Sequence, residues 1–574
     1  MRGFTACFSA SAVLVAFAAS VQAADYTWGG GTGNWSDANW NPGPVSGPTA
    51  GSDTATINTG TVSLNVGGMN VGSLTLGTGG TFNAYNWNGV NTYTGYGNLL
   101  LQGGVINGIG NYHNWGAGIL VNTTVSGSSA STLSASSFFN LNGTGAGSSV
   151  FTVADVTGDA NPDLHVTATL NDVSADNSWV AAALVKEGPG TMRLTSANLY
   201  TGGTTVNQGV LLLDGGSGGY ARIKEALTVN SGASVTFAND DGTGLGWQGF
   251  YKVTALTING GTVSSDGVMH VWDFAGGLNM TGGTLQSNHG VSDAGGPQLE
   301  WNKVDVTTHA SADTATIGGR IRLRADGGYT GLSFNVADGA AAADLLVSAA
   351  VTEASGGLGL VKSGAGTLVL SGANSYSGAT TINDGTLLVN GHHTGGGLIT
   401  LSATATFGGG GQAGDVDVWT AGTLAPGDLE RSDNWLQVGA LSLGDPGAQL
   451  NFELGAPDDG AAPLAVNDLV LAASLPYLRG IVNVIPQTGF ASAPAGSKWR
   501  LIDLTAGTVP AGSELTLAPA LAGGYSLQAA EGDTAVYLVA VPEAGTAGLV
   551  GLALLILRRL RRAGSIVLEK GSIP

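Results

Sequence analysis

Histidines and acidic residues are the side chains of this sequence best suited to catalysis or metal binding, and their spacing is sparse. Five of the seven histidines are isolated: His113, His165, His270, His289 and His309. The other two, His392 and His393, would point to opposite faces of a strand, because successive side chains alternate. The sequence contains no nucleotide-binding loop, nucleophile elbow or zinc motif. We therefore expect no catalytic residue, no metal and no cofactor, and a polysaccharide-degrading enzyme is the least favoured alternative.

One acidic run has the oxygen ligands that calcium prefers. It consists of Asp155, Asp159, Asn161 and Asp163. The equivalent stretch of a duplicated segment, residues 340–343, is alanine. A calcium site in the first segment is an alternative that the duplication does not support.

Tryptophans form a second group of interest, since a flat aromatic face can stack on a sugar ring. Trp28, Trp35 and Trp40 lie near the start of the sequence, and Trp87 and Trp115 lie further on among Tyr, Asn and Gly. A stack of coils exposes apolar core at its first coil, so we expect the first three rings to cap it. Glycan contact is the alternative for these three, and we also consider it for Trp87 and Trp115.

The elements that must position these side chains are short strands in a duplicated segment. Residues 184–213, LVKEGPGTMRLTSANLYTGGTTVNQGVLLL, align without a gap with residues 360–389, LVKSGAGTLVLSGANSYSGATTINDGTLLV. Apolar and polar residues alternate in both copies, and Gly, Asn or Asp closes each run, which predicts strands joined by tight turns. The duplication extends upstream, because 151–155 corresponds to 334–338 and 163–164 to 344–345.

Each copy has four landmark positions with a physical reason for their residue type. They are Gly188, Gly190, Asn198 and Tyr200 in the first copy, and Gly364, Gly366, Asn374 and Tyr376 in the second. The glycines can adopt positive φ where the chain turns before a strand. We expect each Asn to bond the backbone at a corner and to stack on its equivalents in neighbouring coils. Each Tyr is expected to cover that corner.

Both copies resemble the autotransporter-associated β-strand repeat, whose pattern runs roughly LxKxGxGTLxLxGxNxYxGxTxIxxGTLxV. The resemblance implies a right-handed parallel β-helix of the kind found in exported bacterial surface proteins. It implies no catalytic residues.

Composition sets further limits. The chain has 574 residues, of which 43% are hydrophobic and 10% charged, so it can bury a large core and disorder is not expected. The formal net charge of -20 opposes binding to nucleic acid, anionic lipid surfaces and acidic polysaccharides. We therefore exclude nucleic acid as a partner.

The first residues have the features of an export signal. Arg2 is followed by an apolar stretch of signal-peptide length, 10–19, and by the small-residue site Val21-Gln22-Ala23. We expect signal peptidase to cleave after Ala23. The one cysteine, Cys7, lies within this segment, so the mature protein would contain no disulfide.

The end of the sequence carries a candidate sorting signal. Its residues are Val541, Pro542, Glu543, an apolar stretch 547–557, and then Arg558, Arg559, Arg561 and Arg562. This order resembles the PEP-CTERM sorting signal, which implies recognition by an exosortase and release to the outer surface or to extracellular polysaccharide. Ala544 stands where that motif has Pro, and residues 564–574 continue beyond the arginines. The alternative is a plain C-terminal membrane anchor.

These observations predict an all-β protein with five parts. They are a signal peptide (1–23), a right-handed parallel β-helix with an aromatic cap (24–427), a C-terminal β region or closing coils (428–539), a sorting signal with a short transmembrane helix (540–563) and a tail (564–574). We expect a non-enzymatic cell-surface or matrix protein that acts as a scaffold or adhesin. A glycan-binding surface protein is the main alternative, with extracellular polysaccharide as its partner.

Overall fold

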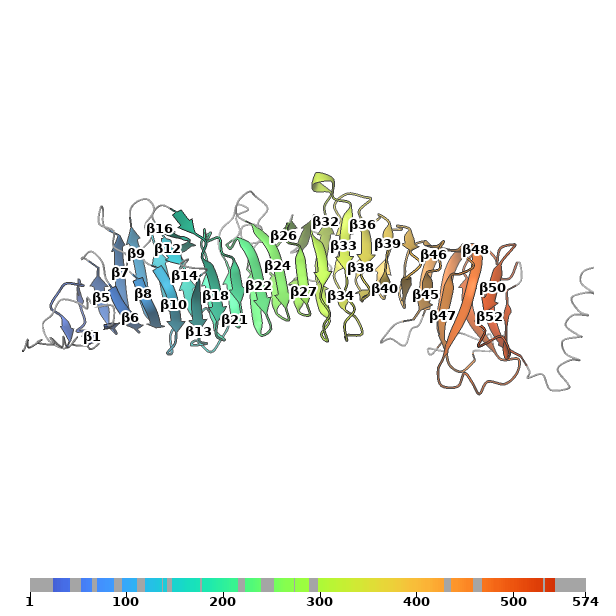
Figure 1. Cartoon of the computed structure of the whole chain (residues 1–574), viewed down its shortest axis with the longest axis horizontal. Coiled ribbons are helices and arrows are strands. Elements are labelled where there is room, and N and C mark those ends of the chain that lie inside the picture. Colours follow the sequence, from blue (N-terminus) through green and yellow to red (C-terminus); the bar gives the residue numbers. More distant parts are fainter. Residues whose placement is uncertain are drawn as a thin grey trace, which may run out of the picture.

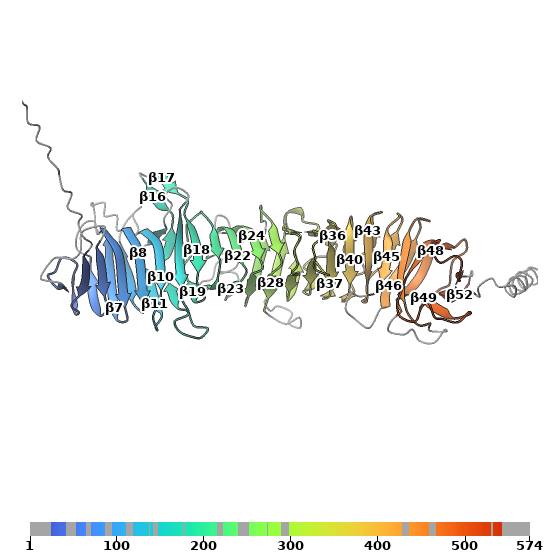
Figure 2. The same cartoon turned by 60° about the horizontal axis from the view of Figure 1, so that its bottom comes forward.

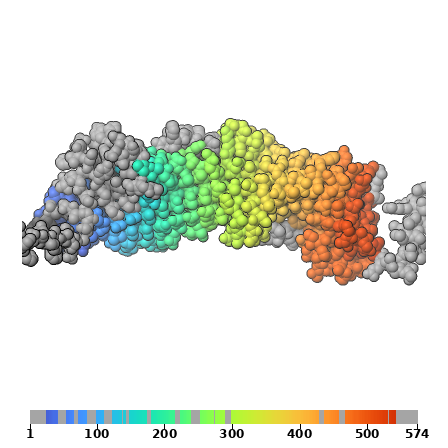
Figure 3. Space-filling model, in the orientation of Figure 1, coloured from blue at the N-terminus to red at the C-terminus, as the bar shows by residue number. Residues whose placement is uncertain are grey.

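The computed structural model of the protein describes an elongated rod of stacked β-coils (Figure 1). The described residues are 24–41, 53–64, 70–86, 95–110, 119–136, 138–141, 147–175, 178–214, 222–238, 252–272, 274–288, 298–427, 435–457, 467–529 and 532–541. The coils follow one another along the long axis in chain order, which Figure 2 shows from a second side. The space-filling view shows them packed into one continuous body (Figure 3).

One long side of the rod, the first sheet, is formed by strands from successive coils. Its strands are β1 (Asp25–Trp28), β3 (Trp40–Asn41), β4 (Thr54–Ile57), β6 (Asn70–Gly77), β8 (Gly95–Gln102), β10 (Ile119–Val125), β12 (Phe138–Leu141), β13 (Ser148–Val153), β15 (Thr169–Asn171), β18 (Ala183–Glu187), β20 (Thr204–Val206), β22 (Glu225–Asn230), β24 (Val253–Asn259), β27 (Leu278–Thr281), β30 (Asp305–Thr308), β33 (Gly331–Asn335), β36 (Gly359–Ser363), β39 (Thr380–Ile382), β42 (Ile399–Leu401), β44 (Val416–Val418), β46 (Trp435–Leu443) and the first half of β48 (Leu469–Pro486).

The second sheet is formed in the same way by the following strand of each coil. Its strands are β2 (Thr32–Asn34), β5 (Gly60–Ser63), β7 (Gly80–Asn86), β9 (Val105–Gly110), β11 (Ser131–Ala135), β14 (Leu164–Val166), β19 (Thr191–Leu194), β21 (Gly209–Leu213), β23 (Ala233–Phe237), β25 (Thr262–Ser265), β28 (Thr284–Ser287), β31 (Ala315–Gly318), β34 (Leu345–Val347), β37 (Thr367–Leu370), β40 (Gly385–Val389), β43 (Ala405–Gly409), β45 (Thr423–Pro426), β47 (Gln449–Leu454), the second half of β48 and β50 (Glu514–Leu517).

Shorter elements close the coils on the third side of the rod. They are the parallel strands β26 (Met269–Trp272), β29 (Leu299–Asn302), β32 (Arg320–Leu323) and β35 (Ala350–Glu353), the pair β38 (Ala373–Asn374) and β41 (His392–His393), the hairpin β16 (Val173–Ala175) and β17 (Ser178–Val180), and the 3-10 turn η1 (Asp326–Gly328).

The pairing of strands follows the predicted coil stack. Leu256 of β24 pairs in parallel with Leu278 of β27, one coil and 22 residues further along the chain. In the first repeat copy β18 pairs with β20 and β19 with β21, and in the second β36 pairs with β39 and β37 with β40. The predicted all-β fold with parallel strands is therefore confirmed, and each repeat copy forms two successive rungs. The right-handed sense stays a prediction.

A single apolar core runs along the rod because side chains alternate between its interior and its surface. In β21, for example, Leu211 and Leu213 are fully buried, whereas Leu212 between them is partly exposed. Full burial of one such side chain contributes about 1.5–3 kcal/mol. Stacking each coil on its neighbours is thus the main source of stability.

Polar side chains on the outer face of the first sheet form ladders between coils. Asn259 Nδ2 donates to Asn230 Oδ1 (3.0 Å), and Asn230 Nδ2 donates to Asn207 Oδ1 (2.6 Å). Asn207 Nδ2 in turn donates to Glu187 Oε1 (2.5 Å). The parallel register places equivalent side chains next to each other, so these amides hold neighbouring coils in alignment.

The parallel stack continues beyond residue 427 and ends in antiparallel strands. β46 pairs in parallel with the first half of β48, and β47 pairs in parallel with its second half. The final strands β49 (Lys498–Leu504), β51 (Tyr525–Gln528) and β52 (Ala535–Ala540) pair antiparallel, with buried Trp499 packed against Phe490 and Tyr525. This change of direction covers the last coil.

Candidate functional site

The three N-terminal tryptophans lie inside the first coils. Trp28, Trp35 and Trp40 are 4%, 1% and 2% exposed, and their rings pack edge to face at centroid distances of 5.3 Å (Trp28 to Trp40) and 4.8 Å (Trp35 to Trp40). Trp35 also packs against Phe82 of β7 (5.8 Å), and Trp40 Nε1 donates to the carbonyl of Trp35 (3.0 Å). A sugar ring needs an open aromatic face, so glycan contact by these three rings is wrong.

Several predicted site residues lie outside the described residues. They are Trp87, Trp115, Pro542, Glu543, Arg558, Arg559, Arg561 and Arg562, together with the export signal and the predicted transmembrane stretch. Val541 is the last described residue and is 37% exposed. In the part of the chain that the structure describes, no helix is long and apolar enough to cross a membrane. The glycan contacts of Trp87 and Trp115, the sorting signal and the transmembrane helix remain predictions.

The paired landmark glycines serve two different purposes. Gly188 and Gly364 have φ of 79° and 77°, as predicted for a turn before a strand. Gly190 and Gly366 do not have positive φ, so the prediction is wrong for the second glycine of each pair. A Cβ at Gly190 or Gly366 would lie 2.3 Å or 2.4 Å from a backbone carbonyl oxygen of the preceding coil. Close packing of coils therefore explains the second glycine.

The landmark Asn residues bond the backbone of adjacent segments, as predicted. Asn198 is buried, accepts from Leu170 N (2.8 Å) and donates to the carbonyl of Arg222 (2.7 Å). Asn374 is also buried; it accepts from Val351 N (3.1 Å) and donates to a carbonyl two residues before it (3.2 Å).

The predicted stacking of these Asn residues on equivalent Asn residues is wrong. In β41 the residue paired with Asn374 is His393. Asn198 has backbone groups as its partners on both sides. Stacked amides occur on the outer face of the first sheet instead, where side chains of neighbouring coils meet.

The landmark tyrosines lie in the interior at the corner of the coil. Tyr200 and Tyr376 are fully buried, and their hydroxyls pair with Thr204 Oγ1 (2.6 Å) and Thr380 Oγ1 (2.8 Å). Burial raises the pKa of both phenols, to about 12 for Tyr376. His393 is buried and stacks on Tyr376 at 4.3 Å. These groups are structural and have no access to solvent.

His392 and His393 point to opposite faces of their strand, as predicted. His392 is exposed, and His393 is buried with Nε2 3.0 Å from the carbonyl oxygen of Tyr376. Burial lowers the pKa of His393. The two imidazoles cannot share a metal ion.

Each repeat copy also buries a lysine, which the sequence analysis did not interpret. Lys186 and Lys362 have no exposed surface. Each ammonium group donates to three backbone carbonyls, at 2.7–3.1 Å for Lys186 and 2.6–3.2 Å for Lys362. One carbonyl belongs to the next rung, so the lysine joins two coils. The signal in the sequence was the spacing Leu184 to Lys186, which places both side chains on the same face.

A buried carboxylate of the preceding rung accompanies each lysine. Asp163 accepts the N–H of Thr191 (2.7 Å), and Asp344 accepts that of Thr367 (2.8 Å). Burial lowers the pKa of both lysines to about 8, and neighbouring carboxylates oppose this shift. Three acceptors match the three N–H groups of an ammonium ion, so each lysine is charged at neutral pH.

The acidic run in the first copy is occupied by hydrogen bonds. Asp163 Oδ1 accepts from Val156 N (2.7 Å) and Thr157 N (2.9 Å), and Asp155 Oδ1 accepts from Gly158 N (2.8 Å). Asp159 accepts from the backbone and side chain of Asn161, the bonds that lower its pKa. Among the described residues no group of three or more His, Cys, Asp or Glu could hold a metal ion. These bonds argue against the calcium alternative.

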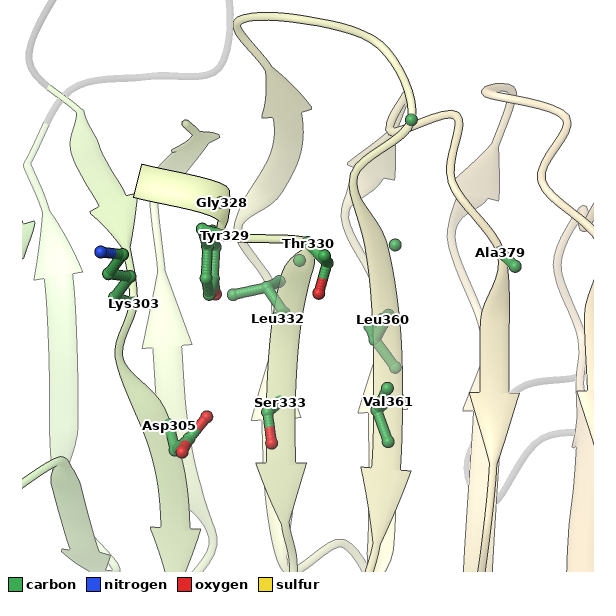
Figure 4. A pocket seen from close by; sticks show the side chains of 13 residues that line it. Lys303, Asp305, Gly328, Tyr329, Thr330, Leu332, Ser333, Leu360, Val361 and Ala379 are labelled. Carbon is green, nitrogen blue, oxygen red and sulfur yellow. The ribbon is translucent and has the colours of Figure 1, made fainter. Parts of the chain in front are cut away.

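A groove of about 500 Å³ lies between the loop that holds η1 and the first sheet (Figure 4). Lys303 and Asp305 line one end, and Leu332 and Val361 of β33 and β36 line the floor. Tyr329 lies beside the Trp301 side chain, and its buried hydroxyl has no hydrogen bond of ordinary geometry to the described residues. Burial raises the pKa of Tyr329, so its phenol stays neutral. The lining includes no His or Cys.

A second exposed feature, here called the aromatic platform, consists of Trp419 and Tyr477. Their side chains are 53% and 51% exposed and meet edge to face at 5.1 Å. The Trp419 ring lies against Gly444 of the next coil, where a Cβ would come within 2.4–2.7 Å of ring atoms. Asp417 and Ser442 share a row with Tyr477 across β44, β46 and β48. Sequence analysis missed this site, because its members come from three coils.

Comparison with known families supports the repeat assignment. The model of the passenger-associated transport repeat matches residues 184–213 and 360–389. These are the two predicted copies. The autotransporter-associated repeat is therefore confirmed at both positions.

Two known proteins are similar to parts of the chain. The adhesin BmaC autotransporter of Brucella suis biovar 1 (strain 1330) is 30% identical over 251 residues, which cover 38% of this chain and 7% of that protein. The chain thus spans a small fraction of that relative. The crystal structure of the Haemophilus influenzae Hap adhesin aligns with 88% of this chain and 65% of its own, at 12% identity and a TM-score of 0.26. A score this low supports no argument, so the fold rests on the strand pairing itself.

Proposed function

We propose that the chain is the body of an exported bacterial surface protein of the adhesin type, and that it acts by presenting its outer faces. The observation that carries the proposal is the pair of matched repeat copies, whose buried Lys and Asn side chains hydrogen-bond to the backbone inside the rod. Lys186 and Lys362 bind carbonyls, and Asn198 and Asn374 bind backbone groups. The similarity to a segment of an adhesin autotransporter supports the same role.

The proposal is non-enzymatic. In the described residues the groove beside Tyr329 and the platform at Trp419 are open surfaces without a nucleophile and a base in contact. Hydrolysis or elimination needs a positioned acid or base close to the bond that breaks. In the described residues, the groove and the platform are surfaces for contact, and neither has a nucleophile hydrogen-bonded to a base.

We further propose that the C-terminal segment directs sorting. Val541 lies at the end of the described rod, where Val541 N donates to the carbonyl of Gly524 (2.8 Å). The motif that follows it in sequence is thus attached directly to the closing strands. Intact mass of the mature protein tests this route: loss of everything after about Pro542 from an extracellular product supports exosortase processing, and an unprocessed tail in the inner membrane contradicts it.

Adhesion is tested with a strain that lacks the gene and one that carries it restored. We expect the deletion to reduce attachment to surfaces or to other cells, with restoration by the full chain. A chain with Trp35→Ala, which should disrupt the packing of the first coils, is the comparison variant. Attachment unchanged by the deletion would contradict an adhesive role.

A further inference from the structure

The aromatic platform is an unusual place for two large aromatic side chains. Burying a Trp or Tyr removes 150–250 Å² of surface from water and stabilises the fold. Trp419 and Tyr477 instead keep about half of their surface exposed. Tyr477 ends a row in the first sheet whose preceding members are Thr381, Thr400, Asp417 and Ser442, and Trp419 lies just beyond β44, two residues after Asp417. Large apolar groups exposed next to a polar row indicate a contact surface.

The sequence around the platform makes room for the indole. Gly444 does not have positive φ, so its backbone conformation is open to any residue. Its Cβ, however, would come within 2.4 Å of the Trp419 ring. Absence of a side chain at this position therefore lets the ring lie on the next coil.

The edge-to-face contact with Tyr477 fixes the ring further. The ring planes are 66° apart at a centroid distance of 5.1 Å, an arrangement that aromatic pairs favour. The indole thus contacts both Gly444 and Tyr477. A surface held in its binding orientation loses little entropy when a ligand arrives.

The groups around the ring are those that recognise a sugar. The face of an aromatic ring carries partial negative charge and attracts the C–H groups of a pyranose face. Ser442 lies beside Tyr477 in the same row and offers a hydroxyl. Asp417 lies on the other side of Ser442, and its Oδ1 is buried without a hydrogen bond to the described residues. Burial raises the pKa of Asp417, and the adjacent Trp419 side chain partly offsets this.

We propose that Trp419 and Tyr477 form a binding site for a neutral saccharide, with a pyranose ring stacked on the indole and Ser442 bonding its hydroxyls. The net charge of -20 opposes an acidic polymer. A single ring with a tyrosine edge is also smaller than the apolar centre of a stable protein interface. The saccharide site names a ligand class for the proposed surface protein, and it rests on that proposed function.

Binding of the full mature protein to neutral oligosaccharides tests the inference. A glycan array carrying cellohexaose, laminarihexaose, maltohexaose and mannans, with alginate as the acidic probe, is followed by calorimetry on the glycans that bind. We expect binding to at least one neutral glycan and none to alginate. Trp419→Ala should weaken it at least tenfold, and Tyr477→Ala severalfold.

Two further variants separate the site from general effects. Gly444→Ala keeps both aromatic side chains and displaces only the indole, so it should also weaken binding severalfold. Trp435→Ala removes another exposed tryptophan of the same sheet, 39% exposed, and should leave binding unchanged. Absence of neutral glycan binding, retention of binding in Trp419→Ala, or binding to vesicles or protein instead would each overturn the inference. Failure of surface display would leave this result unaffected, because the assay uses purified protein.

Discussion

The two repeat copies share their buried polar groups and differ on their outer faces. Lys186 and Lys362 occupy the same place in their coils, each with three carbonyl partners. On the outer face of the second sheet, in contrast, Arg193 of the first copy pairs with His165 (2.7 Å) and with Asp214. The equivalent position of the second copy is Val369, which is 5% exposed.

This difference distinguishes residues that are needed to stack one coil on the next from residues that are available for binding. The interior groups must satisfy buried backbone atoms of the next coil, so both copies retain them. The outer groups have no such requirement and can differ. Binding properties are therefore to be sought where the copies diverge, and in the coils outside them.

The largest expected effect comes from removing the buried lysine of either copy. Lys186→Met or Lys362→Met leaves three carbonyls without their donor, and we expect a loss of about 3–5 kcal/mol in local stability. Hydrogen exchange of the strands in each copy measures this locally, since coils of a repeat protein can open separately. Equal losses of local stability in the two copies would support a shared structural role of the two lysines. A substitution that leaves local stability unchanged in either copy would contradict it.

The pH dependence of the same lysines is the next largest effect. Their pKa is about 8 in the folded protein and 10.5 in its unperturbed form. Between these values the unfolded chain holds the proton that the folded chain has lost, so stability from each lysine rises with pH. Relative to Lys→Met, we expect each lysine to gain on the order of 2 kcal/mol from pH 8 to 10. Denaturant unfolding at both pH values measures it, and a decrease would contradict the assignment.

Replacing the landmark Asn residues should have a smaller and unequal effect. Asn198→Ala removes bonds of 2.8 Å and 2.7 Å, and Asn374→Ala removes bonds of 3.1 Å and 3.2 Å. We expect about 2 kcal/mol for the first and about 1 kcal/mol for the second. Thermal unfolding of the two variants decides the order, and the reverse order would show that bond length does not set the difference.

The smallest effect is expected from exchanging the outer residue between copies. Arg193→Val introduces the residue of the second copy and removes a partly exposed ion pair, which contributes at most about 1 kcal/mol. Burial and then the charge of Arg193 lower the pKa of His165. We expect this pKa to rise in the variant, as NMR titration would measure. A fall, or a large loss of stability, would assign Arg193 a structural role.

The sequence predicted the features that depend on local pattern. Alternation in residues 184–213 predicted short strands, the resemblance to the repeat family implied that they are parallel, and the neighbouring His392 and His393 were correctly placed on opposite faces. Residue type alone did not show that Gly190 is needed for close packing, since the contact is with the preceding coil. That information exists only once the register is known.

The tryptophans show the same limit for the candidate site. Trp35 and Trp419 are each followed by a hydroxyl residue, Ser36 and Thr420. Trp35 is nevertheless 1% exposed and Trp419 is 53% exposed. Trp35 packs against Phe82, and the position of the Trp419 ring depends on Gly444, each from another coil. A pattern read along one coil cannot distinguish them.

Labelling of intact cells with an amine reagent that does not cross membranes tests the central claim most directly, that the repeats are the interior framework of a rod displayed outside the cell. Lys303 is exposed, whereas Lys186 and Lys362 are fully buried. Mass spectrometry should find Lys303 labelled on living cells and the two repeat lysines unlabelled until the protein is unfolded. Labelling of Lys303 only after lysis would contradict display, and labelling of Lys186 or Lys362 on intact cells would contradict the interior framework.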